Sequence, residues 1–181
     1  EAKIDWRDMF DGNVRSQFES DYTLSRLSRN DIGGGFIFPA QDNDFHVSVD
    51  VLIDASGSMT DEMQREVLSE VKGIMQSYSD FQLRICSFDT LLYDYGTIFT
   101  HHNIDEIDDY QVKGGGGTDA SVFWDKLLED EYVPEQIVVF TDGYLGSVEH
   151  GGWGIPDYAK TMWVIHGGFR GKAPYGETYY Y

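Results

Sequence analysis

The segment HVSVDVLIDASGSM, residues 46–59, decides the fold of this chain. Its first part is rich in β-branched residues and bounded by turn formers, which predicts a buried strand. Directly after this strand come Asp54, Ser56 and Ser58, spaced two residues apart. A turn would explain the aspartate, and a helix N-cap would explain one hydroxyl, at Ser58 or at Thr60. Neither explains a carboxylate and two hydroxyls together, so the rest of the chain must decide what this loop does.

Strands and helices alternate along the chain after this segment. Residues 61–78 place apolar side chains on one face at helical spacing. Further helices are expected at residues 103–110 and 120–129, and further strands at FQLRICSF (81–88), LLYDYGTIFT (91–100), QIVVFT (136–141), TMWVIHG (161–167) and GETYYY (176–181). At least three strands are continuously apolar, which is typical of a parallel sheet covered on both faces. We therefore expect an α/β fold with a doubly wound, Rossmann-like, mostly parallel sheet.

The first 45 residues differ from the rest of the chain. IDWRDMF predicts a short helix, and the segment DYTLSRLSRND shows no clean period before the glycines of residues 33–35. We expect residues 1–45 to form an N-terminal extension that packs on a main domain of residues 46–181. The chain begins with Glu1 rather than methionine, so we also expect it to be the C-terminal part of a larger protein.

Composition narrows the classes of partner. The formal net charge of −19 should repel nucleic acid phosphates and anionic membrane surfaces, so we expect neither as a partner. An acidic surface also keeps a protein soluble, so the net charge alone does not show whether the acidity selects partners or only serves solubility. The single cysteine, Cys86, lies in an apolar run that predicts a buried, inert thiol. One cysteine and no signal peptide favour a cytoplasmic location.

Oxygen-bearing side chains from three segments should meet at the carboxyl edge of the predicted sheet. Asp54, Ser56 and Ser58 follow the first core strand, Asp142 follows QIVVFT, and Thr118 follows a run of four glycines at a helix start. Ligands bind at this edge in open α/β sheets, where the strand order reverses. Two carboxylates and three hydroxyls suit a hard cation such as Mg²⁺. We predict a divalent metal site here and leave Mg²⁺, Mn²⁺ and Ca²⁺ open.

The motifs DASGSM, GGGGTD and TDG, in this order and after apolar strands, resemble the metal-ion-dependent adhesion site (MIDAS) of von Willebrand factor A (VWA) domains. The resemblance implies that Ser56, Ser58 and Thr118 hold the ion. It implies that Asp54 and Asp142 support the ion, partly through water. It further implies a protein-binding module, in which an acidic side chain of a partner protein completes the shell of the ion.

A narrower resemblance uses both ends of the chain, whereas the VWA motifs cover roughly residues 46–166. Together with IDWRDMF, DYTLSR and APYGE, those motifs resemble the C-terminal VWA-like domain of bacterial and phage proteins described as predicted metal-dependent peptidases. In that family a preceding domain carries a zinc-peptidase-like HExxH motif, and the family implies work alongside MoxR-type ATPases. No HExxH occurs in this sequence, so these residues do not support peptidase activity of the chain itself.

Other interpretations stay open at this point. Asp54 and Asp142 could position a metal-activated water for hydrolysis, although no nucleophile or general base is evident nearby. The glycine run lacks the GK[ST] ending of a phosphate-binding loop. Tyr144 and His150 follow Asp142 in the sequence, so a contact from either to a ligand is open. The sequence favours binding over catalysis, with an upstream peptidase domain or a metal-assisted hydrolase as the alternative.

Overall fold

The computed structural model describes residues 5–16, 47–146, 152–154 and 160–181. They form a seven-stranded sheet with the order β3-β2-β1-β5-β6-β7, and β4 pairs with β2 outside this path. The strands are β1 (Val47–Asp54), β2 (Phe81–Phe88), β3 (Leu92–Tyr93), β4 (Ile98–Phe99), β5 (Gln136–Thr141), β6 (Lys160–Ile165) and β7 (Glu177–Tyr180). Every pairing from β2 across to β7 is parallel, whereas β3 and β4 pair with β2 in antiparallel fashion. The expected mostly parallel α/β sheet is confirmed.

Strand β1 lies at the centre of the sheet because its side chains are apolar on both faces. All of its residues are buried except Ser48, which is half-buried, as expected for a strand covered on both faces. The chain passes from β1 to β2 on one side and later to β5 on the other. The strand order therefore reverses between β1 and β5, and this switch point is where open α/β sheets bind ligands.

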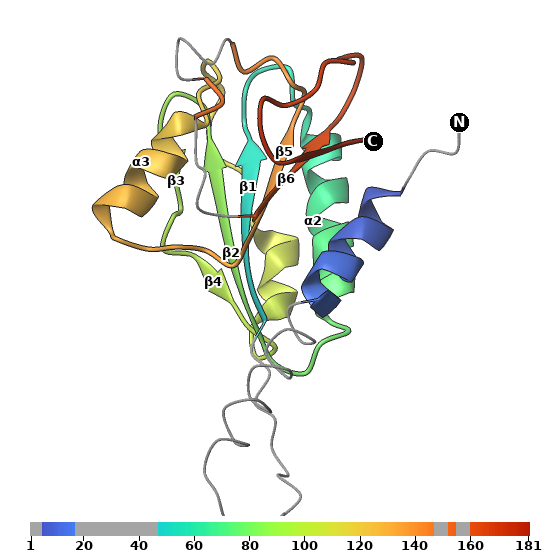
Figure 1. The fold of residues 1–181 in the computed structure, drawn as a ribbon. Helices are drawn as coiled ribbons and strands as arrows, with labels where there is room; N and C mark the ends of the chain where they lie inside the picture. Colours follow the sequence, from blue (N-terminus) through green and yellow to red (C-terminus); the bar gives the residue numbers. More distant parts are fainter. Residues whose placement is uncertain (1–4, 17–46, 147–151, 155–159) are drawn as a thin grey trace, which may run out of the picture.

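Helices cover both faces of the sheet (Figure 1). Helix α2 (Asp61–Met75), the 3₁₀ helix η1 (Ile104–Asp109) and a helix of residues 6–16 pack on one face, and α3 (Ser121–Glu129) packs on the other. Helix α2 begins at an N-cap, Thr60, whose Oγ1 accepts a hydrogen bond from the Met63 N–H at 3.3 Å. Each face therefore has its own apolar cluster, and the sheet separates the two.

Two elements differ from the sequence predictions. Helix α2 ends at Met75 rather than Tyr78, because the Ser77 hydroxyl donates to the Ile74 carbonyl and a turn follows. The segment of residues 91–100 was expected to be one strand, and that expectation is wrong. It forms β3 and β4, separated by a turn in which Asp94 has a positive φ of 57°. Such a backbone angle cannot be part of a strand.

The N-terminal helix is part of the main core. Trp6, Phe10 and Val14 are buried in the same cluster as the α2 face of the sheet, and Trp6 packs edge-on against Phe140 with ring centroids 5.1 Å apart. The predicted domain boundary after residue 45 stays a prediction, because residues 17–46 lie outside the described part. In the described part, no helix combines the length and the apolar character needed to cross a bilayer. Cys86 is fully buried, as the sequence predicted.

Candidate metal site

Asp54 links the loop after β1 to the end of β5. Its side chain is fully buried, and its Oδ1 accepts a hydrogen bond from the Ser56 N–H at 2.8 Å. Its Oδ2 accepts one from the Thr141 hydroxyl at 2.6 Å. Burial raises the pKa of Asp54, the hydrogen bonds from Thr141 and Ser56 lower it, and the negative charge of Asp142 raises it further, so the net shift is upward. One oxygen of Asp54 therefore holds the backbone at Ser56, and the other ties this loop to the end of β5.

The two serines and Asp142 lie next to one another, at the loop that Asp54 holds. Ser56 Oγ lies 3.1 Å from Ser58 Oγ, and the Ser58 hydroxyl donates to Asp142 Oδ2. Asp142 Oδ1 accepts a hydrogen bond from the Tyr144 N–H at 3.1 Å. Ser56 and Asp142 are buried, whereas Ser58 is exposed. Side-chain oxygens from two loops thus converge at the switch point, and one side of the group faces solvent.

Thr118 lies on a third loop that packs beside the first. Gly114 has a φ of 147°, and a Cβ there would lie 2.5 Å from the Cβ of Ala55, so only glycine allows this approach. The Gly116 N–H donates to Asp89 Oδ2 at 3.1 Å. Thr118 is half-buried, and among the described residues no hydrogen bond joins it to the other predicted ligands. The structure therefore connects four of the five predicted residues by hydrogen bonds and places the fifth on a neighbouring loop.

Two positioning residues were missed by the sequence analysis. Thr141 joins Asp54 to β5, and its hydroxyl also accepts from the Gly143 N–H at 3.1 Å. Asp89 holds the glycine-rich loop. Burial alone would raise the pKa of Asp89, but hydrogen bonds from the Leu91 and Gly116 N–H groups hold it below its ordinary value. The sequence could have pointed to both residues only through their positions, because Thr141 ends β5 and Asp89 directly follows β2.

The two site carboxylates have no cationic side chain beside them. Asp54 and Asp142 are 0% and 6% exposed, and within the described ranges no Lys or Arg nitrogen lies within 4.0 Å of either. Among these same residues, no group of three His, Cys, Asp or Glu side chains could hold a metal. The candidate site therefore depends on hydroxyls as much as on carboxylates.

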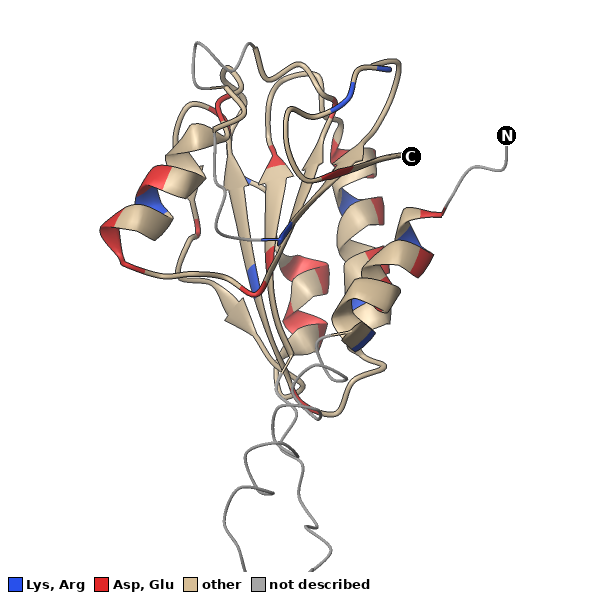
Figure 2. Ribbon diagram, viewed as in Figure 1, with Lys and Arg blue, Asp and Glu red and all other residues tan. Residues whose placement is uncertain are grey.

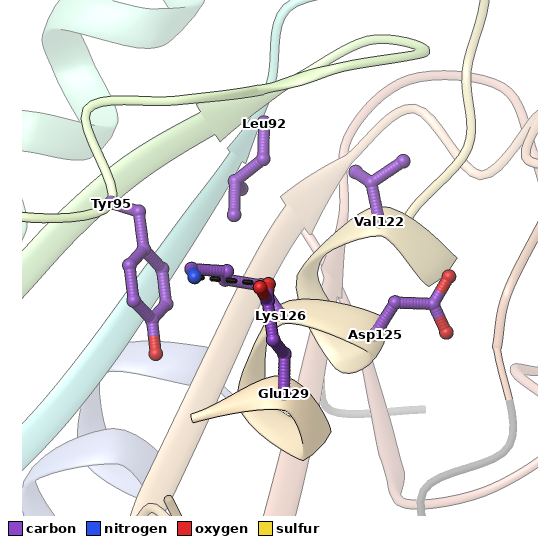
Figure 3. Close-up of a pocket in the computed structure, with 6 residues that line it drawn as sticks. All are labelled: Leu92, Tyr95, Val122, Asp125, Lys126 and Glu129. Atoms are coloured by element: carbon purple, nitrogen blue, oxygen red, sulfur yellow. Dashed lines mark hydrogen bonds and ion pairs between the residues drawn. The ribbon is translucent and has the colours of Figure 1, made fainter. Parts of the chain in front are cut away.

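A separate cavity lies between α3 and the segment that leads into β4 (Figure 3). It has a volume of about 410 Å³ and is lined by Leu92, Tyr95, Val122, Asp125, Lys126 and Glu129. Lys126 Nζ donates to Glu129 Oε2 at 3.0 Å within it. None of the five predicted site residues lines this cavity, so it is distinct from the candidate metal site.

Sequence comparison connects this geometry to a known family. A family model described as "VWA-like domain (DUF2201)" matches residues 49–180, which include every residue of the candidate site. The chain belongs to this VWA-like family. The match confirms the resemblance to VWA domains at the level of the fold, and the VWA-like domain of this chain extends to β7.

The solved structures that match this chain include two bacterial proteins. A crystal structure of the conserved hypothetical protein BatB from Bacteroides thetaiotaomicron shares 14% identity over 67% of this chain and 67% of its own, with a TM-score of 0.47. An uncharacterized membrane spanning protein from Vibrio fischeri shares 17% identity over 66% of this chain and 71% of its own, with a TM-score of 0.34. The comparison with curated proteins found no match. His150, the other residue considered near the site, lies outside the described residues.

Proposed function

We propose that this VWA-like domain is a divalent-metal-dependent protein-binding module. The observation that carries the proposal is the pair of buried carboxylates, Asp54 and Asp142, next to two converging serine hydroxyls. Moving a carboxylate out of water costs several kcal/mol unless an opposite charge compensates it. No described Lys or Arg supplies that charge, and a bound divalent cation would. The donor set fits such a cation, because its oxygens are the hard ligands that Mg²⁺ and Mn²⁺ prefer.

The five residues would divide the work of holding the ion. Ser56, Ser58 and Thr118 would be direct ligands, and Asp54 and Asp142 would support the ion partly through water. When bound, the ion would supply an electrophilic position for an anionic oxygen, since neutral hydroxyl ligands leave it much of its charge. The exposure of Ser58 leaves room for a carboxylate from a partner protein. The domain would therefore bind an acidic side chain of another protein.

Calorimetric titration with Mg²⁺ and Mn²⁺ tests the metal site. We expect saturable uptake by the wild type and a loss of at least about tenfold in affinity, about 1.4 kcal/mol, for Ser58→Ala and for Asp142→Asn. Ser77→Ala is the matched control, because this exposed serine lies beyond the far end of α2 and should leave affinity unchanged. No uptake by the wild type, or equal uptake by all three variants, would contradict the proposal.

The narrower family resemblance adds two predictions about context. An HExxH domain would precede this chain in a longer protein, and a MoxR-type ATPase would be a partner. A hydrolytic role for the site itself would need a general base. Among the described histidines, His166 packs its ring against Tyr181 with centroids 5.1 Å apart, and His101 and His102 follow β4. We therefore put forward binding, rather than catalysis, as the function of this domain.

A further inference from the structure

The loop that joins β6 to β7, residues 166–176, borders the candidate metal site. It begins at the carboxyl end of β6, where the His166 N–H donates to the Thr141 carbonyl at 2.8 Å. A Cβ at Gly143 would lie 2.5 Å from the ring of Phe169. The Phe169 ring therefore packs on the backbone immediately after Asp142, and this contact brings the loop next to the site.

Two exposed cations come after Phe169 in this loop, Arg170 and Lys172 (Figure 2). Among the other described cations, Arg65 and Lys160 are in no ion pair with a described acid. The remaining six are ion-paired with described acids, namely Arg7, Arg15, Lys72, Arg84, Lys113 and Lys126. No described Asp or Glu lies within 4.0 Å of Arg170 or Lys172. In a chain with a net charge of −19, two cations without a described acidic partner at one loop are a distinct feature.

Carbonyl groups of the loop hold Arg170 in place, but not every N–H group of the guanidinium has an acceptor there. Arg170 Nη1 donates to the carbonyls of Gly167 at 2.9 Å and Phe169 at 3.2 Å. The Tyr180 hydroxyl donates to the Gly171 carbonyl at 2.6 Å, which ties the loop to β7. Nε and Nη2 of Arg170 have no acceptor among the described residues. A guanidinium held this way can still accept a carboxylate from outside.

Two aromatic side chains connect this loop to the candidate metal site. Tyr144 is 65% exposed, and its ring lies edge-on to Phe169 with centroids 5.6 Å apart. Contacts therefore run from Asp142 through Tyr144 and Phe169 to Arg170. Tyrosine and arginine are among the residue types enriched at the centres of protein interfaces.

We infer that Tyr144, Arg170 and Lys172 form a second subsite that binds an acidic peptide segment of the same partner protein. The inference rests on the proposed function, in which a first carboxylate of the partner reaches the metal ion. A second acidic side chain of that segment pairs with Arg170 or Lys172, and the intervening residues lie on Tyr144. Charge complementarity at this loop selects an acidic segment over a neutral or basic one, whereas the net charge of −19 of the whole domain slows the approach of any acidic partner.

Peptide selection tests the subsite. A random peptide library is selected on the immobilised protein in Mg²⁺, and the enriched peptides are measured by titration with and without EDTA. We expect wild-type selection to enrich peptides with at least two acidic residues. The double variant Arg170→Glu/Lys172→Glu should bind them about tenfold more weakly, since each rim pair contributes up to about 1 kcal/mol. Its Mg²⁺ uptake should equal that of the wild type.

Lys160→Glu is the matched control. Lys160 is also exposed and in no ion pair with a described residue, but it begins β6 at the opposite edge of the sheet, so peptide affinity should not change. If the double variant binds the peptides as the wild type does, or if enriched peptides carry a single acid, the subsite is wrong and the metal-dependent binding function still stands. If no peptide depends on Mg²⁺, both are overturned.

Discussion

Asp50 is the residue that the apolar pattern of β1 does not explain. It is 1% exposed and lies opposite Arg84 on β2, with Arg84 Nε 3.3 Å from Asp50 Oδ1. The Tyr132 hydroxyl donates to Asp50 Oδ2 at 3.0 Å, and the Arg84 guanidinium lies 4.4 Å from the ring centroid of Tyr95. Burial raises the pKa of Asp50 to about 6, although Arg84 and Tyr132 lower it. The folded protein therefore holds this proton more tightly than the unfolded chain does.

This raised pKa predicts a pH-dependent contribution to stability. Between pH 4 and pH 6 the folded state binds more protons at Asp50, so its contribution to stability falls as the pH rises through about 6. Relative to Asp50→Asn, the wild type should lose on the order of 3 kcal/mol of unfolding free energy between pH 4 and pH 7. Urea unfolding of both proteins across this range measures the difference. Asp125→Asn, at an exposed position of α3, should show no such trend; a flat difference for Asp50→Asn would contradict the assignment.

The sequence pointed to candidate site residues but not to the residues that position them. Asp54, Ser56 and Ser58 follow an apolar strand within a few residues, so a local motif reveals them. Thr141 gains its role only because β5 pairs in parallel with β1, with Phe140 opposite Ile53. That register joins positions far apart in the chain, and a single sequence does not show it. Asp89 depends in the same way on the path of the glycine-rich loop.

The glycine-rich loop before α3 is the element that carries Thr118 beside the loop of the two serines. It passes close to Ala55 at Gly114, and Asp89 holds it at Gly116. The run of four glycines is visible in the sequence, but the contact with Ala55 is visible only in the structure. The sequence did not indicate that β3 and β4 would be separate strands, because the alternation of residues 91–100 conceals the turn at Asp94.

Gly114→Ala tests whether this loop is fitted to the site. The added Cβ would lie 2.5 Å from the Cβ of Ala55 at a φ of 147°, so the loop must move. We expect a loss of about 2 kcal/mol in unfolding free energy and weaker Mn²⁺ binding, measured by urea unfolding and calorimetry. Gly96→Ala is the control, because an added Cβ there meets nothing within 4 Å. Unchanged stability and metal affinity in Gly114→Ala would show that the loop is not constrained.

For the molecule as a whole, the folded unit is larger than the family match. The match begins at residue 49, yet the helix of residues 6–16 contributes Trp6, Phe10 and Val14 to the core. The sequence predicted that an N-terminal extension would contain a helix. It could not predict which surface of the sheet the helix would cover, because that depends on side chains contributed by several distant elements.

Trp6→Ala tests the contribution of that helix. Trp6 is 1% exposed and packs against Phe140, so the substitution should lower the unfolding free energy by about 3 kcal/mol. Thermal and urea unfolding measure the loss. Arg15→Ala removes an exposed ion pair with Asp11 on the same helix and should change little. Equal stability of the two variants would mean that the helix is not part of the core.

The measurement that bears most directly on the metal site is anomalous X-ray diffraction from crystals grown in Mn²⁺. We predict an anomalous peak about 2 Å from the hydroxyl oxygens of Ser56 and Ser58, with Thr118 as a third ligand and the carboxylates of Asp54 and Asp142 beside it. Crystals saturated with Mn²⁺ that show no peak at these hydroxyls would contradict the central claim that this VWA-like domain holds a divalent ion at the end of β1.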